Sequence, residues 1–391
     1  MSTFLIGCGC GPESLTAAAL SAIASAPLLV GAPRLLALFP QKPSVAAVTA
    51  ADIAAALRGA ADGACVLYSG DSGFYSGART LLPLLEGRDV RVLPGLSSLQ
   101  LLAARLCRPW QDWRLCSAHG VDCDVVSAVC GGRPVFFLTG GKVTPSSLCA
   151  ELTAAGLDFL SVAVGENLGC EDERLVTGTA RELAQRTFAP LNVMLCDPAP
   201  RLAPRCPGLP DDCFTRAEGV PMTKQELRAA ILSKLAVTPE DVCWDVGAGT
   251  GSVSVELALH GKSVLAVERS PAALKVAEEN RRKLGAWNLR LVEGTAPDAL
   301  CDLPAPDAVF VGGSGGALSE ILRAVHAANA GARVCVSAIA VETLHTAVET
   351  LRSLGWQTDV TQLCVSRGKA VGGLTMMLAQ NPVYLITGTR S

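Results

Sequence analysis

Short apolar segments alternate with helix-like segments along the first half of the chain. Runs of apolar and β-branched residues predict strands at residues 4–6, 28–30, 65–68, 90–93, 135–138, 161–164 and 191–195. The Ala-rich stretch 16–26 predicts a buried helix. Glycine-rich turns, such as 69–73, follow several of the strands. This alternation predicts an α/β fold, in which ligands usually bind beyond the strand ends.

Prolines mark the end of this first pattern. Five of them stand between residues 198 and 210, where they disfavour both helix and sheet pairing. A helix is predicted next, at 223–235, and Thr223 and Glu226 have the spacing of a capping box at its start. We therefore predict a first domain at 1–205, a linker at 206–218 and a second domain at 219–391.

The second domain repeats the strand and helix alternation. Its strands are predicted at 242–246, 264–268, 289–292, 308–311 and 334–337. Two final apolar runs, 374–378 and 383–386, are joined by a short turn and follow a strand-like run at 360–365. These features predict a Rossmann-like parallel sheet that ends in a C-terminal antiparallel hairpin.

Composition narrows the class of ligand. Half of the 391 residues are hydrophobic and 18% are charged, which suits two well-packed domains. The formal net charge is -3 and no long basic run occurs, so nucleic acid is not an expected partner. The uncharged stretch 15–33 contains Pro27 and several hydroxyl residues, so we expect neither a membrane span nor a secretory signal. A small-molecule ligand is predicted.

Sixteen cysteines are scattered through apolar segments, and no C-x-x-C pair occurs among them. This pattern is typical of reduced thiols in a cytoplasmic protein, and we expect no metal site.

A candidate nucleotide site follows the first strand of the second domain. Residues 247–251 form a glycine-rich turn between a predicted strand and helix, where the backbone can approach a ligand closely. Glu268 ends the next strand, where a carboxylate can accept hydrogen bonds from ribose hydroxyls. A third turn follows at 293–297. A nicotinamide-binding site would show a similar acid, but the G-x-G-x-x-G spacing is not present at Gly247.

The second domain resembles the precorrin C-15 methyltransferase (decarboxylating) family from about residue 219 to its end. The resemblance is carried by residues 221–228, 245–251, 280–283, 312–316, 365–369 and 376–382. It implies a class I methyltransferase fold and contacts to S-adenosylmethionine from Thr223, Gly247, Ala248, Gly249, Thr250, Gly251, Glu268, Gly294, Thr295 and Ala296. Thr295 stands where that family usually has Asp. Gly312 and Gly313 are expected beside the substrate, and Arg367 and Lys369 are candidates to bind its carboxylates.

The first domain resembles the tetrapyrrole methylase (class III) family, in its precorrin C-5 methyltransferase branch. The motifs are residues 7–16, 69–76, 94–100, 117–120, 138–145 and 165–169. The resemblance implies two α/β lobes with S-adenosylmethionine between them, near Gly70, Asp71, Phe74, Ser97, Ser98 and Met194. The macrocycle is expected near Gly7, Gly9 and Gly11, with His119 as a candidate to orient it. Cys10 and Ser72 stand where members of the family often have Pro.

Together the two resemblances imply methylation of a precorrin at carbons 5 and 15, with loss of carbon dioxide from the ring C acetate. We expect a homo-oligomer. The alternatives are a nicotinamide-dependent reductase of the same pathway and a corrinoid carrier. A carrier needs a His in a defined loop motif, and none of the four His residues stands in one.

Overall fold

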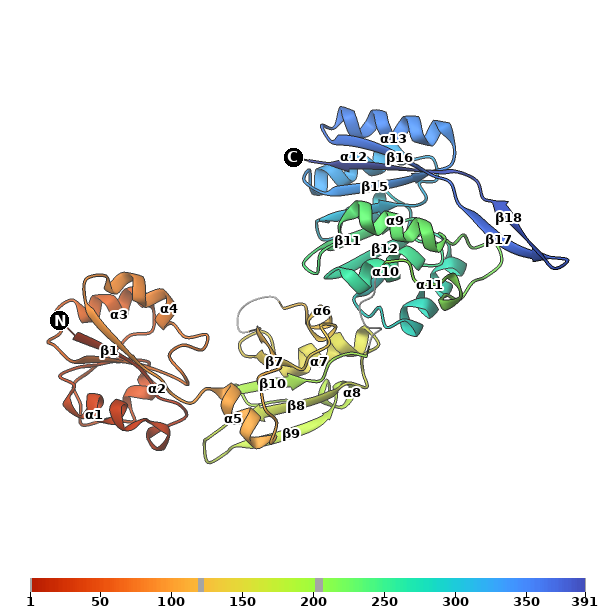
Figure 1. Cartoon of the computed structure of the whole chain (residues 1–391). Coiled ribbons are helices and arrows are strands. Elements are labelled where there is room, and N and C mark those ends of the chain that lie inside the picture. The colour runs from red at the N-terminus through yellow and green to blue at the C-terminus, as the bar shows by residue number, and fades with distance from the viewer. Residues whose placement is uncertain (1, 119–122, 201–206, 391) are drawn as a thin grey trace. The chain divides into compact units, whose positions relative to one another are not determined.

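The chain forms two compact units in the computed structural model, which describes residues 2–118, 123–200 and 207–390 (Figure 1). The first unit contains residues 1–129 and 133–198, and the second contains residues 130–132 and 199–391. Within the described residues, no helix is both long and apolar enough to cross a bilayer.

The first unit begins with a parallel sheet. Its strand order is β3 (Ser44–Ala46), β2 (Leu29–Gly31), β4 (Ala64–Tyr68), β1 (Ser2–Gly7) and β5 (Asp89–Leu93). The helices are α1 (Ala17–Ser25), α2 (Pro33–Leu36), α3 (Ala50–Leu57) and α4 (Ala78–Leu81). Leu5 and Ile6 alternate between the two faces of β1, and each packs into a separate apolar cluster. Both faces of this sheet are therefore covered.

A second sheet completes the first unit, which is two-lobed as predicted. Its order is β6 (Arg114–Ser117), β7 (Val135–Leu138), β10 (Asn192–Cys196), β8 (Ser161–Glu166) and β9 (Arg174–Thr179). Only β6 and β7 pair in parallel. The helices are α5 (Ser98–Arg105), α6 (Val125–Val129), α7 (Pro145–Ala154) and α8 (Ala180–Leu183). The strands β3, β6 and β9 were not predicted, because at least half of the side chains in each are exposed and none of the three forms a long apolar run.

The second unit is built on a mixed sheet, in agreement with the predicted Rossmann-like domain. The strand order is β13 (Leu289–Glu293), β12 (Ser263–Glu268), β11 (Val242–Val246), β14 (Ala308–Val311), β15 (Arg333–Ala338), β19 (Val383–Thr389) and β16 (Gln357–Leu363). The strands before β19 in this order are parallel, and β19 is antiparallel to both neighbours. One face packs on α9 (Gln225–Leu235), α10 (Ser252–His260) and α11 (Pro271–Lys283), and the other on α12 (Leu318–Ala328) and α13 (Val341–Ser353).

The C-terminal antiparallel hairpin is present, but our pairing of its strands was wrong. β18 (Leu374–Ala379) pairs with β17 (Ser366–Val371), not with the run at 383–386. That run belongs to β19, inside the sheet, where Leu385 and Ile386 are fully buried. Burial separates the two runs, because the side chains of β18 are exposed throughout. The hairpin of β17 and β18 is drawn apart from the sheet in Figure 1.

The stretch predicted as a linker contributes to the core of the second unit. Leu209 and Phe214 join one of its large apolar clusters, and a short 3₁₀-helix, η3 (Asp211–Cys213), lies between them. The predicted capping box is wrong, because α9 begins at Gln225 and no side chain of its N-cap residue closes it. Asp211 does so instead: its Oδ1 accepts a hydrogen bond from the backbone N–H of Gln225, at 2.9 Å.

Candidate functional site

A glycine turn follows β11 at the carboxyl edge of the second unit's sheet. Gly247, Gly249 and Gly251 all have positive φ, at 78°, 57° and 72°. A Cβ on Gly247 would lie 2.6 Å from the carbonyl oxygen of Gly313, and one on Gly249 would lie 2.7 Å from that of Pro221. The turn therefore requires glycine both for its conformation and for its close packing.

Glu268 holds this turn in place. Its Oε2 accepts a hydrogen bond from Gly249 N at 2.9 Å, and its Oε1 accepts from the N–H groups of Arg269 and Ser270, also at 2.9 Å. A carboxylate has about four acceptor positions, so one remains for a ligand. The structure thus gives Glu268 a backbone-anchoring role that the sequence did not predict.

A cavity of about 360 Å³ lies between these elements, within the size range of small-molecule sites. Several predicted donor contacts line it: Thr223, Gly247, Ala248, Gly249, Glu268, Gly294, Thr295 and Ala296. Gly312 and Gly313, predicted on the substrate side, line it as well. We call this space the donor cavity.

Two of the predicted donor contacts lie outside this lining. Thr250 is fully buried, and its Oγ1 has no hydrogen-bond partner in the part of the chain that the structure describes. Gly251 packs against Ala277, whose Cβ would lie 2.9 Å from a Cβ on the glycine. Contacts of Thr250 and Gly251 with the donor stay predictions.

A second cavity, of about 310 Å³, adjoins the donor cavity. The two share Gly312, Gly313 and Ser314, and the second extends along residues 336–340 to Thr343. We call it the acceptor cavity. The sequence did not identify residues 336–340 and Thr343 as part of a site, although the carboxyl end of a predicted parallel strand lies there, at the ligand-binding edge of the sheet.

Asp245 lies beneath the glycine turn and is buried. Its Oδ2 accepts a hydrogen bond from the hydroxyl of Ser254, whereas its Oδ1 has no partner among the described residues. Burial raises the pKa of Asp245 to about 7, against the opposing hydrogen bond from Ser254 and with a smaller contribution from the charge of Glu268. The carboxyl group is therefore substantially protonated at neutral pH.

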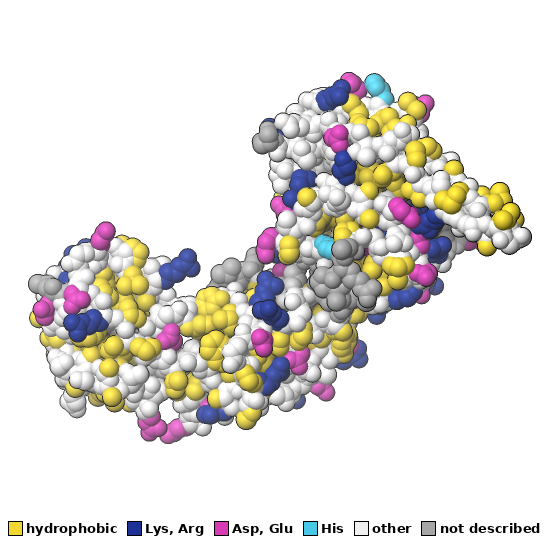
Figure 2. Space-filling model, viewed as in Figure 1, with side chains coloured by type: hydrophobic (Ala, Val, Ile, Leu, Met, Phe, Trp, Pro, Cys, Tyr) yellow, Lys and Arg dark blue, Asp and Glu magenta, His cyan; other side chains and the backbone are white. Residues whose placement is uncertain are grey.

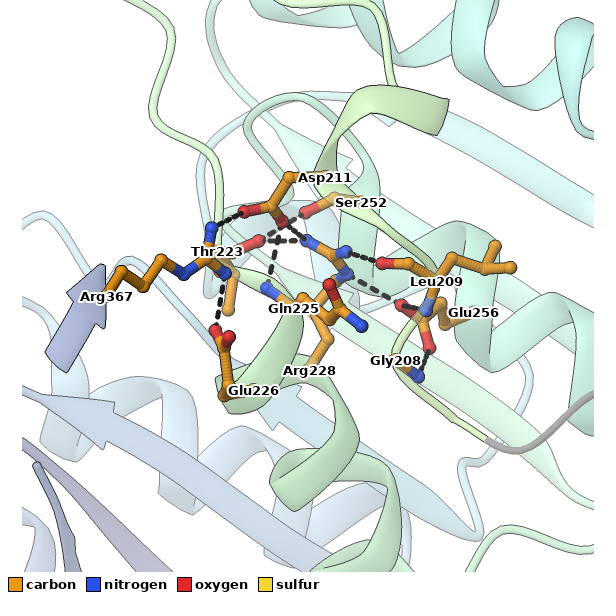
Figure 3. A network of polar contacts seen from close by, with 10 residues as sticks. All are labelled: Gly208, Leu209, Asp211, Thr223, Gln225, Glu226, Arg228, Ser252, Glu256 and Arg367. Atoms are coloured by element: carbon orange, nitrogen blue, oxygen red, sulfur yellow. Dashed lines mark hydrogen bonds and ion pairs between the residues drawn. The ribbon is translucent and has the colours of Figure 1, made fainter. Parts of the chain in front are cut away.

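A buried arginine is the centre of a polar network that includes Thr223, one of the residues that line the donor cavity (Figure 3). Arg228, fully buried on α9, donates from Nε to Glu256 Oε1 at 2.6 Å and from Nη1 to Asp211 Oδ1 at 2.9 Å. It also donates to the backbone carbonyls of Thr223 and Leu209. Such extensive pairing is what permits a charged side chain in the core.

Arg367 extends this network from the C-terminal hairpin (Figure 3). On β17, it donates from Nη1 to Asp211 Oδ2 at 3.0 Å and from Nη2 to Glu226 Oε2 at 2.6 Å. Burial would raise the pKa of Asp211, but Arg228 and then Arg367 outweigh it and lower that pKa. The hydrogen bond from Arg367 likewise lowers the pKa of Glu226. Two carboxylates therefore already bind Arg367. Lys369, on the same strand, is exposed. Contacts of Arg367 and Lys369 with the substrate stay predictions.

In the first unit, glycines allow three strand-end turns to pack together. A Cβ on Gly7 would lie 2.7 Å from both Gly70 O and Gly95 N. Gly9 and Gly70 exchange backbone hydrogen bonds of 3.0 and 2.9 Å. The N–H of Gly11 donates to Ser14 Oγ at 3.2 Å. Gly7 and Gly9, both predicted beside the macrocycle, therefore contact the predicted donor loop.

Asp71 joins two of these turns. Its Oδ1 accepts from Gly73 N at 2.8 Å and its Oδ2 accepts from Gly95 N at 3.1 Å. Ser97 caps α5 by accepting from the backbone N–H of Gln100, and Ser98 is the first residue of that helix. Asp71 and Ser97 therefore have structural roles beside their predicted contacts with the donor.

Phe74, in the predicted donor loop, contacts the second lobe. Its ring meets that of Phe136 with centroids 6.0 Å apart, and it packs against an apolar cluster that includes Val193. Met194, the next residue on β10, is fully buried and faces Phe137 and Val164 in the sheet register. His119 lies outside the described residues.

Two family models match the chain, one over each unit. Residues 4–184 match the tetrapyrrole (corrin/porphyrin) methylases, and residues 212–390 match the precorrin methyltransferase domain.

Curated relatives match one or both units. The precorrin-6Y C(5,15)-methyltransferase [decarboxylating] of Sinorhizobium sp is 32% identical over 325 residues, which are 81% of this chain and 78% of that protein. Neither unit alone is that long, so the similarity spans both. The probable cobalt-precorrin-6B C(15)-methyltransferase (decarboxylating) of Pyrobaculum calidifontis is 46% identical over 185 residues, which are 46% of this chain and 95% of that protein.

A solved structure is similar to part of the chain. The crystal structure of precorrin-6y C5,15-methyltransferase from Geobacter metallireducens is 40% identical, covers 48% of this chain and 98% of its own, and has a TM-score of 0.45.

Proposed function

Because this chain belongs to the family of precorrin C5,15-methyltransferases (decarboxylating), we propose that it transfers methyl groups from S-adenosylmethionine to carbons 5 and 15 of a precorrin. The same reaction sequence would remove carbon dioxide from the ring C acetate. The observation that supports this most directly is the similarity over both units, together with a cavity at the glycine turn of the second.

The donor cavity fits S-adenosylmethionine in size and in chemistry. Its volume of about 360 Å³ and its glycine-rich turn allow close approach of a nucleoside. Glu268 has one acceptor position left for the ribose, and residues 294–296 would enclose the adenine. When bound, the donor supplies an electrophilic methyl group on a sulfonium.

The work of this protein would be positioning. The donor and acceptor cavities share the wall of Gly312, Gly313 and Ser314, so a substrate carbon in one can lie next to a donor in the other. In-line displacement depends on that alignment and on excluding water, rather than on a covalent enzyme group. The side chain of Ile339 is 64% exposed and lines the acceptor cavity, where it would contact an apolar ring face.

Decarboxylation would share the acceptor cavity. As the C–C bond to the acetate carboxylate breaks, carbon dioxide leaves and the electron pair of that bond passes into the conjugated macrocycle; a proton from water then takes the place of the carboxyl group on the remaining carbon. Thr343 and Ser337, which line the acceptor cavity, offer hydroxyl groups that can orient the substrate's carboxylates.

The first unit would methylate carbon 5. We assign its donor to the surroundings of Gly70, Asp71, Phe74, Ser97, Ser98 and Met194, and the macrocycle to those of Gly7, Gly9 and Gly11. The packing of the Gly70–Asp71 turn against Gly7 and Gly9 supports this assignment, because it fixes the donor loop beside the macrocycle loop.

We also propose that the protein is a cytoplasmic homo-oligomer. The cysteines in the described ranges are free thiols. Apolar side chains gather on the C-terminal hairpin (Figure 2), where Leu374, Met376, Met377 and Leu378 are 46 to 73% exposed. Such a surface is typical of a protein interface, and light scattering across a concentration series measures the assembly.

Product analysis tests the proposed function. The full chain, given a precorrin and S-adenosylmethionine with a labelled methyl group, should add two labelled methyl groups and release one carbon dioxide, as mass spectrometry would show. Comparing the rates with a metal-free and a cobalt-containing precursor would show which of the two is the physiological substrate. Binding of NADH in place of S-adenosylhomocysteine would overturn the proposal in favour of a reductase.

A further inference from the structure

We propose that Arg367 is a positioning residue for the donor cavity: through Asp211 and Glu226 it holds the start of α9, and with it the chain segment that forms one wall of the cavity. The identity of the cavity's ligand rests on the proposed function. The coupling itself rests on the contacts of the described residues.

The segment 219–223 forms this wall of the donor cavity. Gly219, Val220, Pro221 and Thr223 all line the donor cavity. The carbonyl oxygen of Pro221 lies against Gly249 and accepts a hydrogen bond from Thr250 N at 3.3 Å. A shift of this segment would therefore change the shape of the cavity at the glycine turn.

This segment has no regular structure, and side chains help to hold it. Residues 220–224 belong to no helix or strand. The carbonyl of Thr223 accepts hydrogen bonds from Arg228 and, at 3.4 Å, from the hydroxyl of Ser252. The fixed position of Arg228 therefore determines where the wall ends and α9 begins.

Asp211 fixes Arg228 and the helix start together. One oxygen of this carboxylate binds both Arg228 Nη1 and the N–H of Gln225, at 2.9 Å each, and the other binds Arg367. Arg367 comes from a strand 156 residues further along the chain. Without it, Asp211 and Glu226 would both lose a guanidinium partner while their like charges still interact, which would favour rearrangement.

This role differs from the substrate contact that the sequence predicted for Arg367. A residue that only binds substrate carboxylates would leave the ligand-free protein and the affinity for the donor product unchanged. A positioning residue alters both. The same contacts would also link the hairpin that bears Arg367 to the donor cavity.

Amide hydrogen exchange and ligand binding on the full chain test the proposal. In Arg367→Gln, amides of residues 219–225 should exchange faster than in wild type. The affinity for S-adenosylhomocysteine at the second unit should fall about fivefold or more, as is typical for coupled sites. The site of the second unit can be told from that of the first, because Gly249→Leu should lose only the second unit's site in calorimetric titrations. Arg367→Lys, which keeps the charge but not the two-armed geometry, should lie between.

A matched control is available on the same helix. Lys234, near the end of α9, pairs with Asp359 of β16 at 2.9 Å, so Lys234→Gln removes an ion pair of similar kind away from the cavity. It should match wild type in both measurements. Glu226→Gln removes only the more exposed of the two partners of Arg367. It should raise the exchange rates and lower the affinity by less than Arg367→Gln does. If Arg367→Gln does not fold, Glu226→Gln tests the positioning role in its place.

Wild-type behaviour in Arg367→Gln, or equal changes in Lys234→Gln, would overturn the positioning role. If the wild type itself binds no S-adenosylhomocysteine at the second unit, the proposed function fails, while the exchange rates still decide whether Arg367 positions the wall.

Discussion

Glycine serves different purposes at the two candidate donor sites. In the first unit, three turns pack directly on one another, and a Cβ on Gly95 would lie 2.4 Å from Gly70 O and 2.5 Å from Gly7 O. In the second unit, Gly247 and Gly249 pack on chain at one side and line a cavity of about 360 Å³ at the other. A glycine motif therefore predicts close approach without saying whether chain or ligand approaches.

The two sites also differ in how their turns are held. Asp71 ties its turn to Gly95, within a single sheet region. The second site depends on Glu268 and on a network of buried charges that reaches from Leu209 to the C-terminal hairpin. We therefore expect the second site to be more sensitive than the first to substitutions of residues outside the cavity.

The largest effect is expected for Arg228→Met. It leaves the carboxylates of Asp211 and Glu256 buried without their main partner, so the free energy of unfolding of the second unit should fall by about 3 to 5 kcal/mol. Peptide-resolved hydrogen exchange should show the loss in the second unit and unchanged protection in the first. Equal loss of protection in both units would contradict the expected difference between the two sites.

Gly249→Leu should abolish one reaction and spare the other. The new side chain meets the carbonyl of Pro221 and intrudes on the cavity, so methylation at carbon 15 should fall by about 100-fold or more, with decarboxylation. Methylation at carbon 5 should persist in the mass spectrum.

Asp71→Ala gives the reciprocal result, a product with one added methyl group and one lost carbon dioxide. If Gly249→Leu still releases carbon dioxide without methylating carbon 15, decarboxylation belongs elsewhere.

Glu268→Ala should have a smaller effect. It removes three backbone hydrogen bonds as well as the acceptor for ribose, so donor affinity at the second unit should fall by about 1.5 to 3 kcal/mol. Glu268→Gln keeps one carbonyl acceptor and should lose less. Calorimetric titration with S-adenosylhomocysteine measures both, and an unchanged first site serves as the control.

The smallest effect concerns pH. The pKa of Asp245 is about 7 in the folded chain, above the ordinary value of 3.8, so the folded state holds more protons between these values. The stability from this group is therefore fully present below the lower value and lost as the pH rises through 7. Asp245→Asn should remove about 1 kcal/mol of this decline between pH 6 and pH 8, measured by urea unfolding. A decline of the same size in the variant would contradict the assignment.

The sequence predicted the parts of the fold that rest on local patterns. The strands of the second unit's sheet were predictable because runs such as 242–246 and 308–311 are mostly apolar and buried. The partner of β19 was not, because adjacency along the chain favoured a hairpin, while burial of Leu385 and Ile386 places that strand inside the sheet.

The predicted donor residues were those that glycine turns and strand ends mark in the sequence. Asp211, Arg228 and Glu256 went unrecognised, because their contacts join segments 17 to 48 residues apart and each residue alone reads as a surface charge. Arg367 was noticed for its charge, yet its partners lie 141 and 156 residues away. No pattern of neighbouring residues indicates such pairings.

The burial of Leu209, Asp211 and Phe214 determines where this chain can be divided in evolution or by a protease. A break after residue 218 would remove the carboxylate that caps α9 and the aromatic ring that lies 4.5 Å from the guanidinium of Arg228. A break before residue 207 would leave both with the second unit. Gene fusion or fission that preserves a working second enzyme therefore has to carry this stretch along, although its prolines give it the sequence of a connector.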